Sequence, residues 1–121
     1  MTIAETRTQL GRYGEACAAR HLTCHEGMVV LDRNWRCELG EIDLVLRDGD
    51  VLVVCEVKTR SSERFGSTIE AVTEVKAARL RVLAQRWCET RGLRPEHLRI
   101  DVVGVLLDGQ RIVRIDHARG I

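Results

Sequence analysis

EIDLVLRDGDVLVVCEVK, residues 41–58, is the stretch that decides how this chain folds. Its first part, Glu41–Leu46, alternates polar and apolar residues, and Val51–Val57 is an almost unbroken apolar run. Asp-Gly between two such runs is typical of a tight β-hairpin. We therefore predict a hairpin that turns at Asp48-Gly49, with a second strand that is buried on both faces.

Upstream of the hairpin, the pattern indicates a helix from Leu10 to about Cys24 and a strand over Met28–Trp35. Apolar or small residues recur along the helix at spacings of three and four, which places them on one face. This stripe comprises Leu10, Gly14, Cys17, His21 and Cys24.

Downstream, the polar stretch Thr59–Thr68 suggests a loop. Thr73 is a good N-cap for a second helix, and Gly92 followed by a proline ends it. Two further strands are expected at Leu98–Leu107 and Arg111–Ile115, joined by a second Asp-Gly turn. The order α-β-β-β-α-β-β predicts an α/β fold with a central sheet flanked by helices.

Composition fits an ordinary globular chain. With 121 residues, 45% of them hydrophobic and 31% charged, the chain is expected to form a single domain over 1–121. Residues 1–8 contain no apolar run or basic patch, so we expect a flexible N-terminal segment rather than a signal peptide. No window approaches the roughly 20 apolar residues of a membrane span. These features predict a cytoplasmic protein without a membrane partner.

The five cysteines are scattered and odd in number, which favours reduced thiols over a disulfide framework. Cys17, His21 and Cys24 are spaced so that a helix would place them on one face. This spacing is compatible with a zinc site, although no fourth ligand is evident and the same face also suits a core.

Charge is unevenly distributed although the net charge is only +1. Between Lys58 and Arg99 there are ten Lys and Arg residues against five Asp and Glu. Charge alone favours a solvated helix face here, with a nucleic-acid-binding surface as the alternative. Lys76 and Arg79 lie three apart near the start of the second helix, where backbone amides also favour phosphate.

Three residues of the hairpin form the candidate site. Glu56 and Lys58 are two apart on the second strand, so their side chains point to one face. A turn at Asp48-Gly49 would pair residue 43 with a position near 54. Asp43 and Glu56 would then be diagonal neighbours, with backbones roughly 7–8 Å apart. Two carboxylates at that spacing can share one divalent cation.

Glu56 is unexpected because it stands in an apolar strand, where a buried carboxylate needs a cationic partner. Taken alone, the Glu-x-Lys pair more often marks a structural ion pair or an exposed strand end. The position of Asp43, thirteen residues earlier and across a hairpin, makes a catalytic site a better reading.

That arrangement resembles the PD-(D/E)xK endonuclease superfamily. The likeness extends over GRYGEACAARHL (11–22), LDRNWRCELGEIDLV (31–45), VCEVKTR (54–60), GSTIEAVTEVKAARL (66–80) and LRIDVV (98–103). Together these segments resemble the YraN-like proteins, uncharacterised protein family 0102, which are related to Holliday-junction resolvases. The resemblance implies a restriction-endonuclease-like core with a mixed sheet. One departure is Ile42, which stands where the superfamily pattern has proline.

The resemblance also implies roles. Asp43 and Glu56 would bind the metal, with the main-chain carbonyl of Val57 as a further ligand and Glu15 acting through water. Lys58 would orient and help deprotonate the attacking water or stabilise charge on the phosphate. All-oxygen ligation favours Mg²⁺ or Mn²⁺, either of which activates water and stabilises the phosphate.

The resemblance implies hydrolysis of DNA phosphodiester bonds, with branched DNA as a candidate substrate, by a homodimer with two sites. Arg60, Lys76 and Arg79 are candidate contacts to the nucleic acid, and Glu41 a candidate for a second metal; each also suits an ordinary surface role. The competing hypothesis is a non-catalytic nucleic-acid-binding module that keeps the nuclease fold. A pure binder, however, gains nothing from carboxylates that face phosphate.

Overall fold

The computed structural model describes residues 3–61 and 73–121. It confirms the predicted order of two helices and five strands. In the described part of the chain, neither helix is long and apolar enough to cross a membrane. The elements are α1 (Ile3–Cys24), β1 (Val29–Cys37), β2 (Gly40–Asp48), β3 (Val51–Arg60), α2 (Glu74–Arg91), β4 (His97–Asp108) and β5 (Arg111–Ala118).

The five strands form one mixed sheet in the order β1-β2-β3-β4-β5. Neighbouring strands are antiparallel except β3 and β4, which are parallel and pair from Val51–His97 to Arg60–Leu106. A parallel pair needs a crossover connection, and α2 lies within it. The sheet and its flanking helices agree with the α/β, restriction-endonuclease-like core expected from the sequence.

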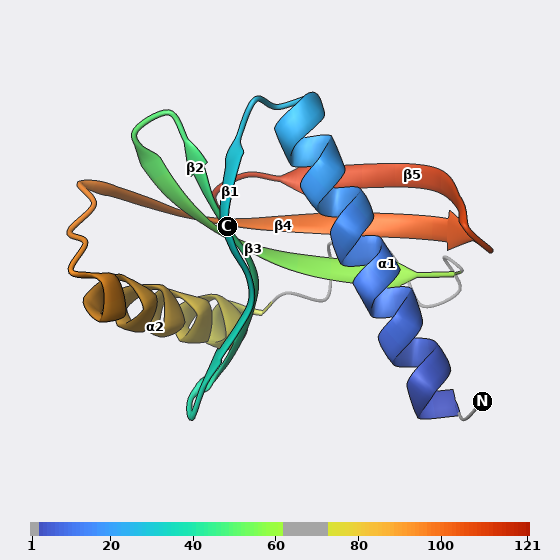
Figure 1. Ribbon diagram of the computed structural model, residues 1–121, viewed down its shortest axis with the longest axis horizontal. Helices are drawn as coiled ribbons and strands as arrows, with labels where there is room; N and C mark the ends of the chain where they lie inside the picture. The colour runs from blue at the N-terminus through green and yellow to red at the C-terminus, as the bar shows by residue number, and fades with distance from the viewer. Residues whose placement is uncertain (1–2, 62–72) are drawn as a thin grey trace.

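The two helices cover opposite faces of the sheet (Figure 1). α1 crosses the sheet obliquely and packs, through residues such as Cys17 and Leu22, on apolar side chains of β2, β3 and β4. α2 packs its Leu80, Leu83 and Trp87 on the other face, against a second cluster from β2, β3 and β4. β3 and β4 contribute to both clusters, which explains why their sequences are almost continuously apolar.

Two of the predicted elements, the first helix and the second strand of the hairpin, were too short. α1 begins at Ile3, so residues 3–8, which we expected to form a flexible segment, are part of the helix. β3 continues through Thr59 and Arg60, where the sequence suggested a loop, because β4 is long enough to pair with both residues. The remainder of that predicted loop, 62–72, lies outside the described residues.

The predicted turn was displaced by one residue. Asp48 pairs with Val51, so the loop residues are Gly49 and Asp50 rather than Asp48 and Gly49. Gly49 has φ +62°, and a glycine with positive φ at the first loop position is the arrangement of a type II′ turn. Leu44 consequently pairs with Cys55, which places Asp43 opposite Glu56 and not diagonal to it.

β1 and β2 change faces together at their centre. Leu44 and Leu46 pack on the α1 side, whereas Ile42 packs on the α2 side, although strict alternation would put all three on one face. The change falls at Asp43 and at Asn34, which lies opposite it and has φ +50°. The β1–β2 connection therefore bends toward α2, where Glu38 pairs with Arg86 (Figure 1).

Candidate functional site

The candidate site lies where β2 separates from β3. The pairing of these strands ends at Leu44–Cys55, although β2 begins at Gly40 and β3 runs on to Arg60. Over the same stretch β3 stays paired with β4. Asp43 and Glu56 are thus the first residues beyond the last pair, at the mouth of the opening between the two strands.

Asp43 closes this end of the ladder with its side chain. The backbone N–H of Val57 donates a hydrogen bond of 2.8 Å to Asp43 Oδ2. In a regular antiparallel ladder a main-chain carbonyl would accept that bond. The carboxylate of Asp43 is therefore held against the edge of β3, one residue from Glu56.

The surroundings of Asp43 oppose its ionisation. The pKa of Asp43 is raised to about 7, chiefly by burial and also by the nearby carboxylates of Glu56, Glu15 and Glu41, against the lowering effect of the hydrogen bond from Val57. A carboxylate in such a place is stabilised by a cation. This makes Asp43 the acidic group in the described residues with the clearest need for a positive partner.

Glu56, by contrast, already has two cationic partners. Its side chain is buried, and its Oε1 lies 3.3 Å from Nζ of Lys58 and 2.6 Å from Nζ of Lys76. Lys58 comes from the same strand, two residues on, and Lys76 from the first turns of α2. The ion pairing explains how a carboxylate can be buried within this strand.

The two lysines affect each other as well. Burial lowers the pKa of Lys58, and the adjacent Lys76 lowers it further, whereas Glu56 acts in the opposite direction. A lysine whose pKa is lowered gives up a proton more readily at neutral pH. Lys58 therefore lies beside Glu56 with a lowered pKa, and its role as the basic residue stays a prediction.

Glu15 reaches the same region from α1. Gly14 lets the helix approach β3 closely, since a Cβ at this position would lie 1.9 Å from Oγ1 of Thr59. Burial raises the pKa of Glu15 and the charge of Glu41 adds to this, while hydrogen bonds with Asn34 and Asp43 partly offset both. Glu15 thus interacts with Asp43, and its predicted contact with a metal through water stays a prediction.

Two hollows flank the acidic residues, one on each side of the sheet. The hollow on the α2 side has a volume of about 240 Å³, and the one beside α1 has about 480 Å³. Glu41 lines both, and its Oε2 lies 3.3 Å from Nη2 of Arg36. The first is lined by Gly40, Glu41, Asp43, Glu56, Lys76, Arg79, Leu80 and Leu83; the second by Gly11, Arg12, Glu15, Asn34, Arg36 and Glu41.

The three predicted nucleic-acid contacts, Arg60, Lys76 and Arg79, differ in exposure and in their distance from the acidic residues. Arg79 is exposed and lines the hollow that also contains Asp43 and Glu56. Lys76 lines it too, but its ammonium group lies on Glu56. Arg60 is half-buried at the end of β3, beside Leu106 of β4. The contact of any of them with nucleic acid stays a prediction.

The residues around Asp43 fit a divalent cation that keeps part of its water shell. No three Asp, Glu, His or Cys side chains in the described ranges converge as a complete ligand set. Mg²⁺ does not require one, because it commonly binds one or two carboxylates and keeps several waters. The donors suit such an ion. A hydrogen bond from Val57 holds the carboxylate of Asp43 in place, and Glu56 is close to it. The neighbouring carboxylates make the ionised form of Asp43 unfavourable, so a bound cation would stabilise it.

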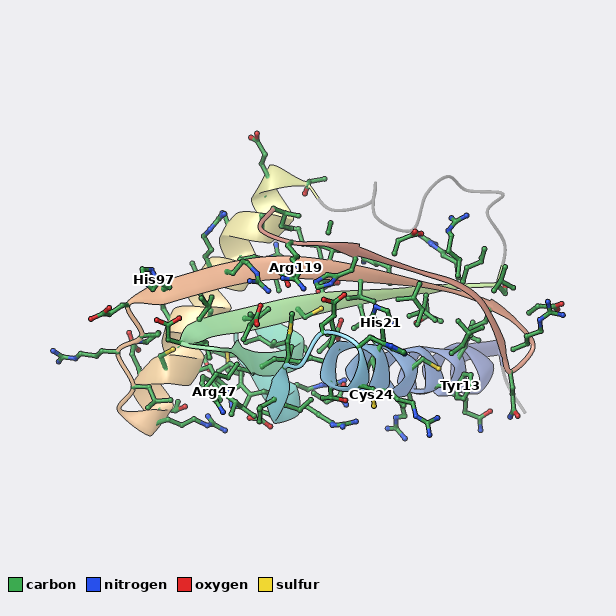
Figure 2. The ribbon with its side chains drawn as sticks, turned by 90° about the horizontal axis from the view of Figure 1, so that it is seen from above. Tyr13, His21, Cys24, Arg47, His97 and Arg119 are labelled. Atoms are coloured by element: carbon green, nitrogen blue, oxygen red, sulfur yellow. The ribbon has the colours of Figure 1, made fainter. Side chains whose placement is uncertain are left out.

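The zinc alternative has no geometric support in the described residues. Cys17 is buried in the core, whereas Cys24 is exposed and lies on the side of α1 away from the sheet (Figure 2). His21, also labelled there, lies 3.9 Å from Glu26 through its Nε2. The stripe that α1 buries runs through Gly14, Cys17, Ala18 and Leu22, so the predicted stripe was wrong at its C-terminal end.

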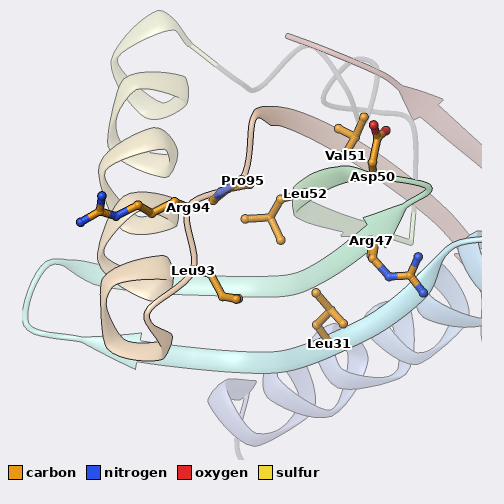
Figure 3. Close-up of a pocket in the computed structure, with 8 residues that line it drawn as sticks. All are labelled: Leu31, Arg47, Asp50, Val51, Leu52, Leu93, Arg94 and Pro95. Atoms are coloured by element: carbon orange, nitrogen blue, oxygen red, sulfur yellow. The ribbon is translucent and has the colours of Figure 1, made fainter.

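A mostly apolar hollow of about 230 Å³ lies at the other end of the β2–β3 hairpin, next to the turn (Figure 3). Its charged residues do not form the kind of carboxylate and lysine cluster that surrounds Asp43. We therefore do not assign the chemistry to it. Its lining consists of Leu31, Arg47, Asp50, Val51, Leu52, Leu93, Arg94 and Pro95.

Parts of the site were not predicted from the sequence. Gly14 was assigned to a helix stripe, although a glycine inside a helix is itself a signal of close packing. Arg12, an exposed residue of the hollow beside α1, was not singled out. Asn34 was given no role beyond shaping the strand end, and its positive φ opposite Asp43 could not be read from the pattern.

Comparison with known proteins places the chain in a family. The profile of "Uncharacterised protein family UPF0102" matches residues 14–105. A UPF0102 protein of Nocardioides sp. is 60% identical over 118 residues, covering 98% of this chain and 94% of its own. A UPF0102 protein of Streptomyces coelicolor is 57% identical over 117 residues, covering 95% and 89% respectively. The chain therefore belongs to the uncharacterised protein family UPF0102, the YraN-like family.

Proposed function

We propose that this protein is a metal-dependent endonuclease that hydrolyses DNA phosphodiester bonds. One observation carries the proposal: Asp43 and Glu56 line the same hollow just beyond the point where the pairing of β2 with β3 ends, and Lys58 contacts Glu56. Carboxylates gathered at an opening in a sheet cost stability unless they serve a cation. Site residues that reduce stability in this way are common in enzymes.

Asp43 and Glu56 would hold Mg²⁺ or Mn²⁺ together with the main-chain carbonyl of Val57. The N–H of Val57 points to Asp43, and in an extended strand the C=O of a residue points to the same side as its N–H. Glu15 would contribute through water, in keeping with its interaction with Asp43. When bound, the ion would activate water and stabilise negative charge on the phosphate.

Lys58 has two roles in this proposal. Its ammonium group would stabilise the charge that develops on the scissile phosphate, and its lowered pKa would make it a better proton donor than an exposed lysine. Its contact with Glu56, at 3.3 Å, fixes it beside the reacting centre. The remaining carboxylates of the cluster orient water rather than contact phosphate.

The substrate class follows from charge and shape. Arg79 and Lys76 lie on the α2 side of the opening, and Arg12 and Arg36 on the α1 side. A polyanionic backbone that crosses the opening would contact both groups while its phosphate approaches the carboxylates. Arg60, at the end of β3, would extend this contact. Branched DNA and a homodimer with two sites follow from the family resemblance alone.

The test is a cleavage assay with linear, nicked, flap and four-way DNA in Mg²⁺ and in Mn²⁺. We expect metal-dependent cutting that falls by about 10²–10⁴-fold in Asp43→Asn, Glu56→Gln and Lys58→Met. Glu89→Gln is the matched control, because it removes a carboxylate from an exposed site on the opposite end of α2. This control should cut at the wild-type rate.

The competing function, a nucleic-acid-binding module without catalysis, predicts a different result. Such a protein would bind the DNA panel but leave every substrate intact in both metals. Asp43→Asn would then bind DNA more tightly than the wild type, because it removes negative charge that repels phosphate. Cleavage that tracks Asp43 and Glu56 would exclude this module.

A further inference from the structure

Lysine occurs only twice in this chain, at Lys58 and Lys76, whereas arginine occurs 17 times. Both ammonium groups lie on the same atom, Oε1 of Glu56, at 3.3 Å and 2.6 Å. All other basic positions, most of them at the surface, carry arginine or histidine. Lysine therefore occurs in this chain at the two positions whose side chains contact Glu56, the proposed metal-binding carboxylate.

The two residue types differ in how firmly they hold a carboxylate. Arginine forms two parallel hydrogen bonds and keeps its charge under all ordinary conditions. Lysine acts as a compact point charge on a flexible stem, so its contact is more easily given up. An ammonium at position 76 can pair with Glu56 and also leave it by rotating about its own side-chain bonds.

Lys76 and Lys58 are held differently. Lys58 belongs to β3 and is fixed close to Glu56 by the strand. Lys76 lies on α2, near its N-terminus, and reaches across to the sheet. Its side chain lines the same hollow as Asp43, Glu56 and Arg79, so it has space into which it can move.

We infer that Lys76 is a built-in counterion that occupies the cation position beside Glu56 and is displaced when a divalent metal ion binds. An ammonium group 2.6 Å from Oε1 and an ion coordinated by the same carboxylate repel each other. The metal ion therefore binds only those molecules in which Lys76 has left Glu56. Because this fraction is small, the apparent metal affinity is much lower than the intrinsic affinity of the site. This inference rests on the proposed function, since it concerns the metal of the same site.

The displaced ammonium stays within the opening. Arg79, three residues further along α2, lines the same hollow, so Lys76 would move toward a surface that is already positive. Metal binding thereby adds a phosphate-binding cation next to the reacting centre. Lys76 thus suppresses metal binding in the free protein and is available to DNA in the loaded one.

The test measures Mn²⁺ binding to the full chain without DNA, by electron paramagnetic resonance of the free ion. Lys76→Met keeps the side-chain stem and helix propensity but removes the charge. We expect it to bind Mn²⁺ about tenfold more tightly than the wild type, or more. Arg79→Met is the matched control: it removes one positive charge from the same hollow and should change the affinity by less than about twofold.

A second measurement follows the lysines directly. With lysine labelled with ¹³C at Cε, the protein gives two signals, and Lys58→Arg identifies which is which. We expect saturating Mg²⁺ to shift the Lys76 signal and sharpen it as the side chain is released. An unchanged Lys76 signal at a Mg²⁺ concentration that saturates the site would overturn the inference.

The outcomes separate this inference from the proposed function. If the wild type binds Mn²⁺ and Lys76→Met binds it equally or less tightly, Lys76 is a structural partner of Glu56 and the inference is wrong. If Lys76→Met binds Mn²⁺ while the wild type does not, the inference is supported in its strongest form. If neither protein binds Mn²⁺ although both are folded by circular dichroism, the proposed metal site is wrong and the inference fails with it.

Discussion

Asp43 shows how one residue can be both a defect in the fold and the centre of the proposed chemistry. It is half-buried, it accepts a hydrogen bond from Val57, and other carboxylates surround it. In a protein with no use for a cation, an asparagine would make the same hydrogen bond without the charge. The cost of this carboxylate is therefore measurable in the metal-free protein.

We predict that Asp43→Asn stabilises the metal-free protein above pH 7. The folded pKa of Asp43 is about 7, above the value of 3.8 for an unperturbed group, so the folded state holds the proton more tightly than the unfolded state. Stability is consequently lost as pH rises from about 4 to about 7. Thermal unfolding at pH 8 should show the variant melting roughly 3–8 °C higher.

The difference should shrink when the same measurement is made near pH 5. Added Mg²⁺ should raise the melting temperature of the wild type but not of the variant, because the ion binds the folded state only. A variant that melts lower than the wild type at pH 8 would mean that the Asp43 carboxylate is already well compensated.

Gly14 permits a second prediction about a single residue. We expect Gly14→Ala to destabilise the fold by about 1–3 kcal/mol, because its Cβ would overlap Thr59 and push α1 from β3. Gly11→Ala is the control on the same helix; a Cβ there meets nothing within 4 Å, and the change should be neutral or stabilising by up to about 1 kcal/mol. Equal effects in urea unfolding would contradict the close packing of α1.

At the scale of elements, the ends of α2 could be predicted from the sequence, whereas the register of the hairpin could not. Thr73 and Gly92 cap α2 as expected, because capping is a local interaction that needs few neighbours. The turn allowed two registers, with residue 43 opposite 54 or opposite 56. These differ by two residues and leave every side chain on the same face, so the apolar pattern cannot distinguish them.

The change of faces at Asp43 also escaped prediction, for a different reason. Alternation along β2 assumes a regular strand, and the sequence carries no marker of the break beyond Asn34 on the neighbouring strand. Asparagine tolerates a positive φ better than most residues, but it does so in many turns and loops as well. The position of Asp43 depends on how the β1–β2 end of the sheet packs against α2. Such packing between distant segments cannot be predicted from the local sequence pattern.

The N-cap of α2 leads to a prediction about the stability of this helix. The Thr73 side chain accepts a hydrogen bond of 3.2 Å from the backbone N–H of Lys76. Thr73→Ala should lower the free energy of unfolding by about 1 kcal/mol, whereas Thr73→Ser should leave it nearly unchanged. Urea denaturation of the three proteins measures the difference. An alanine variant as stable as the wild type would show that the cap does not hold the first turn of α2.

At the scale of the whole molecule, Asp101 connects segments that are distant in the sequence. Its fully buried carboxylate accepts hydrogen bonds from the Arg99 side chain and from the backbone N–H of Gly120. It also lies 2.8 Å from Nε2 of His117. Arg99 in turn pairs with Asp48 at the β2–β3 turn. One carboxylate therefore joins β4, the C-terminal end of β5 and the hairpin.

We predict that Asp101→Asn is destabilising by about 2–3 kcal/mol, since it removes the buried charge that accepts hydrogen bonds from Arg99 and Gly120 and leaves Arg99 with Asp48 as its remaining charged partner. Burial alone would raise the pKa of Asp101, but hydrogen bonds from Arg99, His117 and Gly120 outweigh it and lower that pKa. Its stabilisation is thus complete above about pH 4 and is lost as pH falls further through the folded pKa. The variant's deficit should be largest at neutral pH and shrink below pH 4.

Asp116→Asn is the matched control, because Arg114 and Asp116 form a similar pair of 2.8 Å two residues apart on β5, but at the surface. Its effect should be within about 1 kcal/mol. Equal losses for the two variants in guanidinium unfolding would contradict the central position of Asp101.

The packing of the helices on the sheet determines which residues of the site could be predicted from the sequence. Asp43, Glu56 and Lys58 lie within one hairpin, so local rules brought them together. Glu15 lies on a helix that packs across the sheet, and only the family resemblance connected it with the others. Lys76 was expected at a surface for phosphate, and its contact with Glu56 depends on the packing of α2 on β3.

The central claim is that Asp43 and Glu56 hold a divalent ion that this protein needs to cut DNA. The most direct test is the rate of four-way-junction cleavage in Mn²⁺ for the wild type and for Glu56→Gln, at equal concentrations of folded protein. We predict cleavage by the wild type that stops in EDTA and falls at least about 100-fold in the variant. Cleavage that persists in EDTA, or that is equal in the two proteins, would contradict it.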